Sequence, residues 1–221
     1  MHAWGTPNDL SYSGFAREFY ACMFDHLDSK SSTLETGAGI STVVFALRKA
    51  RHTCVAPDVA ELDRLKAYCA QKGIPIDSID FQPMRSDEYF RQWTPHRLDL
   101  VLIDGCHGFP APFLDWFNVA VSLRVGGLLV IDDTQLWTGR ILKEFLETEP
   151  AWRLEPPHST KTAVFRKIDE DVPWKEWNTQ PYVASRSEVW PPRRSRVGRA
   201  IDLARRGEYA TLLRKVRKAL F

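Results

Sequence analysis

Residues 98–133 read LDLVLIDGCHGFPAPFLDWFNVAVSLRVGGLLVIDD, and this stretch decides the fold class. It holds two apolar runs, LDLVLIDG at 98–105 and GGLLVIDD at 126–133, each with aspartate at or next to its end. Continuous apolar runs of this length are typical of strands buried on both faces of a parallel sheet. Because a helical pattern at 110–124 separates them, we predict a strand, a crossover helix and a second parallel strand.

The same alternation of strand and helix patterns continues on both sides of this stretch. Toward the N-terminus, strands are predicted at 31–35, 52–57 and 78–84, and helices at 9–30, 41–50, 58–73 and 86–93. Toward the C-terminus, a helix at 139–150 precedes two strands at 151–156 and 160–167, which have only a turn between them. We therefore predict an α/β fold with a doubly wound, mostly parallel Rossmann-like sheet that closes with an antiparallel hairpin.

The composition indicates one domain with a helical C-terminal extension. The chain has 221 residues, of which 44% are hydrophobic and 26% charged, and this length allows a substantial buried core. No apolar run approaches the roughly 20 residues that span a bilayer. We predict the α/β domain over residues 1–168, an irregular wrapping arm over 169–198 and a basic amphipathic helix over 199–221.

Basic residues gather at the C-terminus. Residues 191–221 carry a net charge of +8, so that residues 1–190 carry −6 of the chain's total of +2. Such a tail is compatible with peripheral contact with anionic lipid, or with dimerisation against the acidic body of a second copy. Nucleic acid is disfavoured as a partner because the basic excess is confined to the tail.

The cysteines indicate the compartment. Cys22, Cys54, Cys69 and Cys106 are scattered without the spacing of a metal site or a disulfide framework. They are expected to be reduced thiols, with Cys54 in a strand and Cys69 on a helix. We therefore expect a cytoplasmic protein, peripheral at the inner membrane face if the tail binds lipid.

The loop ETGAG at 35–39 lies between a predicted strand and a helix that begins near Ser41. Glycines there allow a sharp turn and a close approach of the backbone to a ligand. A dinucleotide fingerprint would place a third small residue at Thr42, which is neither Gly nor Ala. The Glu35 carboxylate would repel a pyrophosphate but attract an ammonium and a sulfonium. The loop therefore predicts S-adenosylmethionine as the cofactor.

Three segments, LETGAGIS at 34–41, LIDGCHGF…DW at 102–116 and VGGLLVIDDTQLW at 125–137, together resemble the class I S-adenosylmethionine-dependent methyltransferases. The resemblance is to the small-molecule type with an IDGxH motif, and it spans about residues 30–167. One position departs from the family, because Ala56 stands where an acid usually binds the ribose. Asp58, two residues later, either replaces that acid or caps the following helix.

The resemblance also implies which residues contact the cofactor. Those after the third strand, Met84, Arg85 and Ser86, would approach the adenine. The full set expected to bind the cofactor is Glu35, Thr36, Gly37, Ala38, Gly39, Ser41, Asp58, Met84, Ser86 and Asp104.

Three carboxylates end two neighbouring predicted strands. Asp104 follows one strand, and Asp132 and Asp133 follow the next, so they are expected in one crevice beyond the carboxyl ends of the strands. Crowded carboxylates repel unless a cation or a proton joins them, and Mg²⁺ or another divalent cation would suit them. The arrangement resembles metal-dependent O-methyltransferases acting on catechols and caffeoyl thioesters. Alternatively, Asp132 caps a turn and Asp104 supports the cofactor loop.

His107 lies three residues beyond Asp104, where it could deprotonate a substrate hydroxyl; alternatively, it bonds only to the loop backbone. Asp132 is expected to hold a metal or to orient the substrate. We predict O-methylation of a small molecule, a sugar or a glycolipid, with or without a metal. The alternatives are a metal-independent N- or C-methyltransferase of the same fold, a nucleotide-cofactor oxidoreductase and a binding module without catalysis.

Overall fold

The computed structural model of the chain describes residues 17–188 and Gly207. The chain divides into two compact units, Met1–Tyr182 and Val183–Phe221. The first part of the helix predicted at 9–30, and the basic helix predicted at 199–221 apart from Gly207, lie outside the described residues.

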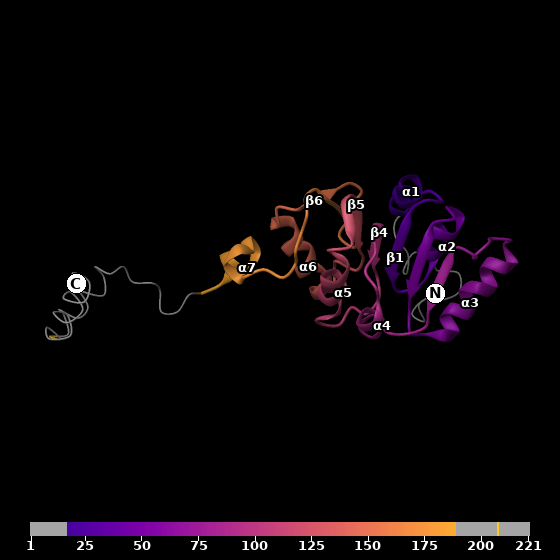
Figure 1. Ribbon diagram of the computed structural model, residues 1–221, viewed down its shortest axis with the longest axis horizontal. Coiled ribbons are helices and arrows are strands. Elements are labelled where there is room, and N and C mark those ends of the chain that lie inside the picture. The colour runs from indigo at the N-terminus through magenta and orange to yellow at the C-terminus, as the bar shows by residue number, and fades with distance from the viewer. Residues whose placement is uncertain (1–16, 189–206, 208–221) are drawn as a thin grey trace. The chain divides into compact units, whose positions relative to one another are not determined.

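Strands and helices alternate along the first unit, as predicted (Figure 1). The strands are β1 (Ser32–Thr36), β2 (Arg51–Val55), β3 (Ile79–Gln82), β4 (Leu98–Ile103), β5 (Leu123–Ile131), β6 (Trp152–Glu155) and β7 (Ala163–Lys167). The helices are α1 (Arg17–His26), α2 (Ile40–Leu47), α3 (Val59–Gln71), α4 (Ser86–Gln92), α5 (Ala111–Val119), α6 (Trp137–Thr148), the 3₁₀ turn η1 (Trp177–Thr179) and α7 (Pro181–Arg186).

The strands form one seven-stranded sheet in the order β3-β2-β1-β4-β5-β7-β6. β1 to β5 pair in parallel, and β7 is antiparallel to both β5 and β6. This topology confirms the predicted Rossmann-like sheet with a closing antiparallel hairpin. Because β1 to β5 are parallel, their carboxyl ends meet at one edge of the sheet, and the antiparallel β7 begins at that same edge.

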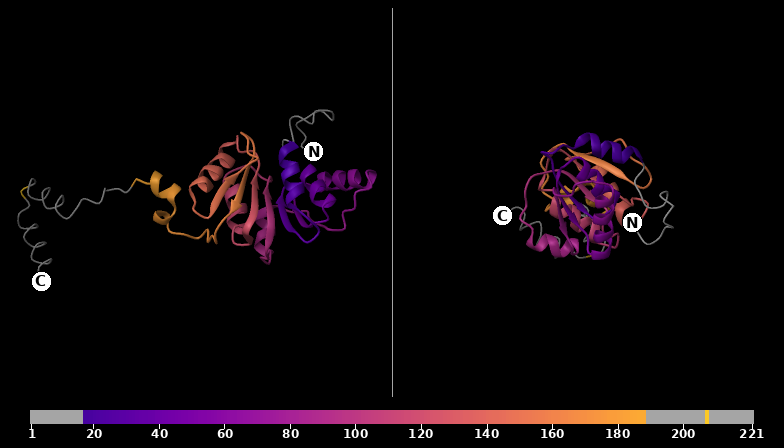
Figure 2. Two further views of the ribbon diagram at one scale, coloured as in Figure 1. Left: turned by 90° about the horizontal axis from the view of Figure 1, so that it is seen from above. Right: turned by 90° about the vertical axis from the view of Figure 1, so that its right-hand side faces the viewer.

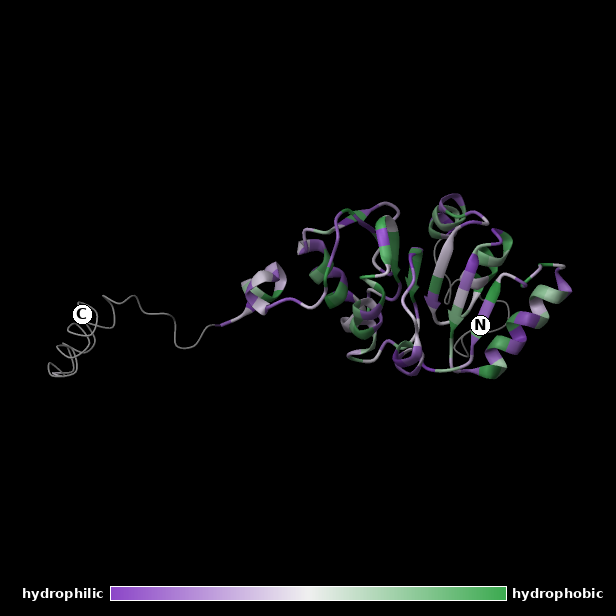
Figure 3. Cartoon of the chain, in the orientation of Figure 1, coloured by the Kyte–Doolittle hydropathy of each residue, from purple (hydrophilic) through white to green (hydrophobic). Residues whose placement is uncertain are grey.

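Helices cover both faces of the sheet (Figures 1 and 2). α1, α2 and α3 pack on one face, where Phe19 and Met23 of α1 join Phe45 of α2 in the core. α4, α5 and α6 lie on the other, where Trp116 and Phe145 meet edge to face. Figure 3 shows hydrophobic and hydrophilic residues alternating along α3, as expected of a half-buried helix.

The structure corrects two predicted element boundaries within residues 98–133. The helix predicted at 110–124 ends at Val119, and β5 begins at Leu123 rather than at Gly126. The pairing of β4 with β5 shifts register at this point, where Gly126 has φ +85°. The glycine therefore bends the strand without ending it, as glycines in strand irregularities do.

The arm after β7 is tied to the domain by a buried carboxylate. Asp171 is 3% exposed and accepts hydrogen bonds from Trp152 Nε1 at 2.7 Å and from Lys175 Nζ at 2.5 Å. Further along, the Tyr182 ring packs edge to face on Phe145. The arm predicted as irregular also contains η1 and α7. Within residues 17–188, no helix combines the length and apolar character needed to cross a lipid bilayer.

Candidate active site

The loop between β1 and α2 turns where Gly37 meets the strand next to it. Gly37 has φ +100°, and a Cβ on it would lie 2.3 Å from the backbone oxygen of Asp104. The Asp104 amide also donates a hydrogen bond to Thr36 O at 2.9 Å. Gly37 is therefore required by the close packing of the loop on β4, because no side chain fits there.

Gly39 has different surroundings. Its backbone is extended, with φ 173°, and a Cβ on it would meet no atom within 4 Å. Its amide donates to Thr42 Oγ1 at 3.1 Å. The open space above Gly39, at the start of α2, is a fitting cradle for a ligand that lies against the loop.

The Glu35 carboxylate faces protein groups. Its side chain is 1% exposed and accepts hydrogen bonds from Ser41 Oγ at 2.6 Å and from Thr42 Oγ1. His52 Nε2 lies 3.1 Å from Glu35 Oε1. This differs from the expected carboxylate open to the cofactor's ammonium and sulfonium. Glu35 and Ser41 instead brace the loop against α2 and β2, because all their nearby partners are buried protein groups.

Other expected cofactor residues follow the ends of the parallel strands. Asp58, after β2, accepts a hydrogen bond from Glu61 N at 3.2 Å and caps α3, while its side chain stays more than half exposed. Met84 and Ser86 follow β3, and Ser86 begins α4. These residues share the carboxyl edge of the sheet with the glycine loop, so they surround the place where ligands bind in open parallel sheets.

A carboxylate and histidine cluster lies at the ends of β4 and β5. His107 Nε2 is 3.0 Å from Asp133 Oδ2, and one donor atom from each of Asp104, His107 and Asp133 lies within 4.8 Å of the others. Asp132 instead accepts a hydrogen bond from Thr162 Oγ1 at 2.6 Å. The metal set expected from the sequence was Asp104, Asp132 and Asp133, whereas this geometry groups His107 with Asp104 and Asp133.

The carboxylates of this cluster perturb one another. Burial raises the pKa of Asp104 well above its usual value, and repulsion from Asp132 and Asp133 raises it further. Burial also raises the pKa of Asp132, although the hydrogen bond from Thr162 opposes the shift. A site of this kind is suited to hold a proton or a cation among its carboxylates.

Two exposed aromatic rings, Phe109 and Trp137, belong to the segments that follow β4 and β5. Phe109 is 70% exposed and Trp137 56% exposed, and their ring centroids are 6.2 Å apart. The hydroxyl of Thr138, the residue after Trp137, donates to His107 O at 2.5 Å and ties the start of α6 to the loop after β4. The rings therefore form an apolar surface beside the cluster.

Sequence reasoning missed two polar residues at this edge. Thr162, just before β7, binds Asp132, and the antiparallel direction of β7 was the signal that could have placed it there. Asp115 on α5 is 1% exposed, and burial is the main cause that raises its pKa to about 6. An aspartate in an otherwise apolar helix, as in FLDWF at 113–117, was the signal for it.

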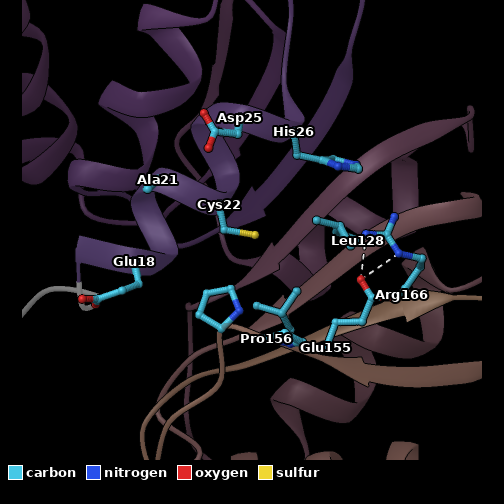
Figure 4. Close-up of a pocket in the computed structure, with 11 residues that line it drawn as sticks. Glu18, Ala21, Cys22, Asp25, His26, Leu128, Glu155, Pro156 and Arg166 are labelled. Atoms are coloured by element: carbon cyan, nitrogen blue, oxygen red, sulfur yellow. Dashed lines mark hydrogen bonds and ion pairs between the residues drawn. The ribbon is translucent and has the colours of Figure 1, made fainter.

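A separate cavity of about 570 Å³ lies between α1 and strands β5, β6 and β7. Figure 4 shows the Cys22 thiol and the Glu155–Arg166 ion pair at this cavity. The expected cofactor, metal and catalytic residues do not line it, as far as the described residues show.

The comparisons with known proteins agree with this geometry. Residues 34–134, a little under half of the chain, match a protein family described as a methyltransferase domain. Among curated proteins, none matches this sequence significantly.

Solved structures of several methyltransferases share the fold. A candidate caffeoyl-CoA O-methyltransferase from Staphylococcus aureus superposes with a TM-score of 0.59 at 14% identity, over 70% of this chain and 85% of that one. An rRNA methylase from Streptococcus thermophilus gives 0.55 at 15% identity, over 71% and 100% of the two chains. A candidate methyltransferase from Streptococcus mutans in complex with SAH gives 0.54 at 14%, over 70% and 100%.

At these identities the solved structures establish the fold alone, and the likeness in activity rests on the match of residues 34–134 to a methyltransferase domain. The matched segment begins inside β1 and ends directly after Asp133, so it contains both the glycine loop and the carboxylate cluster. The family match and the fold together support methyltransferase activity for this chain.

Proposed function

We propose that the enzyme methylates a hydroxyl oxygen of a small molecule, with His107 as the general base. The observation that carries this proposal is the 3.0 Å contact between His107 Nε2 and Asp133 Oδ2 at the carboxyl edge of the sheet. A histidine held by a carboxylate is the usual arrangement for removing a proton from a hydroxyl. His107 follows β4 and Asp133 follows β5, on the same edge of the sheet as the glycine loop, where donor and acceptor can meet.

His107 and Asp133 each have a task in this reaction. Bound S-adenosylmethionine supplies a methyl group that its sulfonium has already activated. As the methyl group passes from sulfur to the substrate oxygen and S-adenosylhomocysteine is left, His107 would accept the hydroxyl proton and Asp133 would stabilise the imidazolium. Because the donor is already activated, the protein contributes mainly by aligning the oxygen with the methyl group.

A second candidate mechanism uses a divalent cation. Asp104, His107 and Asp133 place one donor atom each within 4.8 Å of one another, a fitting set for a metal that accepts both carboxylate and imidazole ligands. In that case His107 is a ligand and not the base, and the ion would lower the pKa of a bound substrate hydroxyl. The two mechanisms make opposite predictions for chelation.

The exposed aromatic pair supports the choice of acceptor. Phe109, two residues after His107, and Trp137 pack near each other and could stack on a planar ring or on the apolar face of a sugar. This surface favours an aromatic or sugar hydroxyl as the methyl acceptor. The net charge of −6 in residues 1–190 opposes a nucleic-acid acceptor.

Methyl transfer from labelled S-adenosylmethionine tests this proposal. Purified enzyme is incubated with metabolite, cell-envelope lipid and ribosomal RNA fractions, with and without EDTA. We expect label in a metabolite or lipid fraction, and labelling that persists in EDTA if His107 is the base. Label confined to RNA would contradict the proposed acceptor class.

The variant His107→Ala tests the base. We expect turnover to fall by about 100-fold or more, the usual contribution of a general base, while the affinity for the cofactor stays unchanged. His96→Ala is the matched control, because His96 is exposed and lies outside the cluster. Full turnover by His107→Ala would contradict the role.

A further inference from the structure

The first turn of α6 contacts both segments that carry the proposed catalytic pair. His107 follows β4 and Asp133 follows β5, so two separate loops must be held together for His107 Nε2 to lie 3.0 Å from Asp133 Oδ2. Thr138 and Gly139 are consecutive residues of α6, and each of them meets one of these loops. The helix is therefore placed to set the distance between the two side chains.

Thr138 holds the loop that carries His107. It is 7% exposed, and its hydroxyl donates to the backbone oxygen of His107 at 2.5 Å. Cys106 and Gly108, on either side of His107, are exposed. Because burial does little to fix a loop of this kind, a hydrogen bond to its backbone has a larger share in holding it.

Gly139 and Leu136 hold the loop that carries Asp133. A Cβ on Gly139 would lie 2.8 Å from the backbone oxygen of Asp133, so the helix backbone packs directly on this residue. The same oxygen accepts the Leu136 amide at 2.9 Å. Asp133 has φ +52°, and a residue other than glycine keeps such a backbone only where its surroundings hold it. The start of α6 supplies those surroundings.

We propose that Thr138 is a positioning residue for His107. Its hydroxyl holds the loop after β4 against α6 and thereby keeps the imidazole beside Asp133. The inference rests on the proposed role of His107 in methyl transfer, and Thr138 acts through the His107 backbone without touching the reacting atoms. Because the glycine loop belongs to the connection between β1 and α2, loss of the Thr138 bond should slow turnover and leave cofactor binding intact.

The variant Thr138→Val keeps the shape of the side chain and removes the donor. Turnover, measured on the metabolite or lipid fraction that the wild type labels, should fall by about tenfold or more, the scale seen when a group that orients a functional side chain is lost. Calorimetry should show unchanged affinity for S-adenosylhomocysteine. Thr138→Ser keeps the hydroxyl and should retain most of the turnover. Weaker binding of S-adenosylhomocysteine by Thr138→Val, or a loss that serine does not restore, would overturn the role.

Thr148→Val is the matched control. The Thr148 hydroxyl also donates to a backbone oxygen, that of Phe145 at 2.9 Å, but at the other end of α6. This variant should leave both turnover and affinity unchanged. An equal loss of turnover in Thr148→Val and Thr138→Val would show that the bond to His107 has no special part, and full turnover by Thr138→Val would also overturn the proposal.

Combined variants test the route through His107. In a His107→Ala background the imidazole is absent, so adding Thr138→Val should cause no further loss of turnover, since residues that act as a unit are not additive. A further loss as large as that of Thr138→Val alone would show that Thr138 acts elsewhere. If His107→Ala itself kept full turnover, the proposed function would fail. A loss in His107→Ala without one in Thr138→Val would remove only the role of Thr138.

Discussion

Gly37 and Gly39 are two residues apart in one loop, yet only Gly37 is fixed by the fold. Its positive φ and its contact with the Asp104 backbone leave no room for a Cβ, whereas Gly39 faces open space. Substitution at these two positions should therefore separate damage to the fold from damage to the binding site.

Gly37→Ala should destabilise the protein by more than about 1 kcal/mol, because alanine is strained at positive φ and its Cβ would collide with the Asp104 carbonyl. Urea denaturation measures the change. A Gly37→Ala protein as stable as the wild type would show that the loop can move away from β4.

Gly39→Val should retain the wild-type melting temperature and lose binding of S-adenosylmethionine, because its side chain would fill the space above the loop. Calorimetry together with thermal denaturation gives both quantities. Unimpaired binding by this variant would discredit the assignment of the loop as the cofactor site.

Asp115 should make stability depend on pH. Its pKa is about 6 in the folded protein and about 3.9 when unfolded, so the unfolded carboxyl loses its proton first as the pH rises. The charged form therefore costs about 3 kcal/mol of stability above pH 6, and this cost disappears below pH 4. Asp115→Asn should be more stable than the wild type at pH 8, and the difference should shrink toward pH 4 in denaturation curves. An equal difference at both pH values would contradict the assignment.

Sequence reasoning predicted which residues gather at the site better than it predicted where their side chains turn. Asp104 and His107 meet Asp133 because the parallel β4 and β5 end at one edge, which the pattern of apolar strands foretold. Asp132 and Asp133 are neighbours in the sequence but have different partners. Asp132 accepts a hydrogen bond from Thr162, whereas Asp133 pairs with His107. Glu35 likewise turns toward His52, a contact across two strands that spacing along the chain does not reveal.

At the scale of single elements, the apolar strands were the most predictable part of the fold. β4 is buried along nearly its whole length, so its apolar run was read correctly. β1 is buried as well, although Leu34 is its one apolar residue. The start of β5 was not read correctly, since Gly126 and Gly127 resemble a turn in sequence. Pairing with β4 keeps this segment in the sheet, and such pairing is a property of the tertiary structure.

A buried lysine joins β7 to the connection between α5 and β5. Lys167 is fully buried, and its ammonium donates to the carbonyls of Ala120 and Leu123, both at 2.9 Å. It also pairs with Glu170 at 3.3 Å. These contacts lie at the start of β5, at the edge of the sheet opposite the active site.

Lys167→Met should therefore lower the free energy of unfolding by about 2–4 kcal/mol, because it leaves two buried carbonyl oxygens without a hydrogen-bond donor. Turnover should stay unchanged. Lys143→Met is the control, since Lys143 makes an i,i+4 pair with Glu147 on the helix surface and should change stability by less than about 0.5 kcal/mol. Denaturant titration and a methyl-transfer assay distinguish the variants. An equal effect of both substitutions would contradict the role of Lys167.

At the scale of the whole chain, charge separates the body from its tail. The net charge of +8 in residues 191–221 predicts salt-dependent binding to anionic vesicles, at roughly 1 kcal/mol per basic residue near the surface. A chain that ends at residue 188 should lose this binding in a sedimentation assay but still methylate a soluble acceptor. If truncation instead converted a dimer to a monomer without affecting vesicle binding, the dimerisation hypothesis would replace the membrane one.

The place of β7 between β5 and β6 has a consequence for biosynthesis. As the chain leaves the ribosome, β6 emerges first, yet its partner in the sheet is β7, which follows it. In a nascent chain, β6 therefore cannot pair with the sheet until residues 163–167 have emerged. Asp132 likewise gains its hydrogen bond from Thr162 only after Thr162, directly before β7, has emerged. The carboxyl edge of the sheet is therefore complete only once residues 162–167 have emerged.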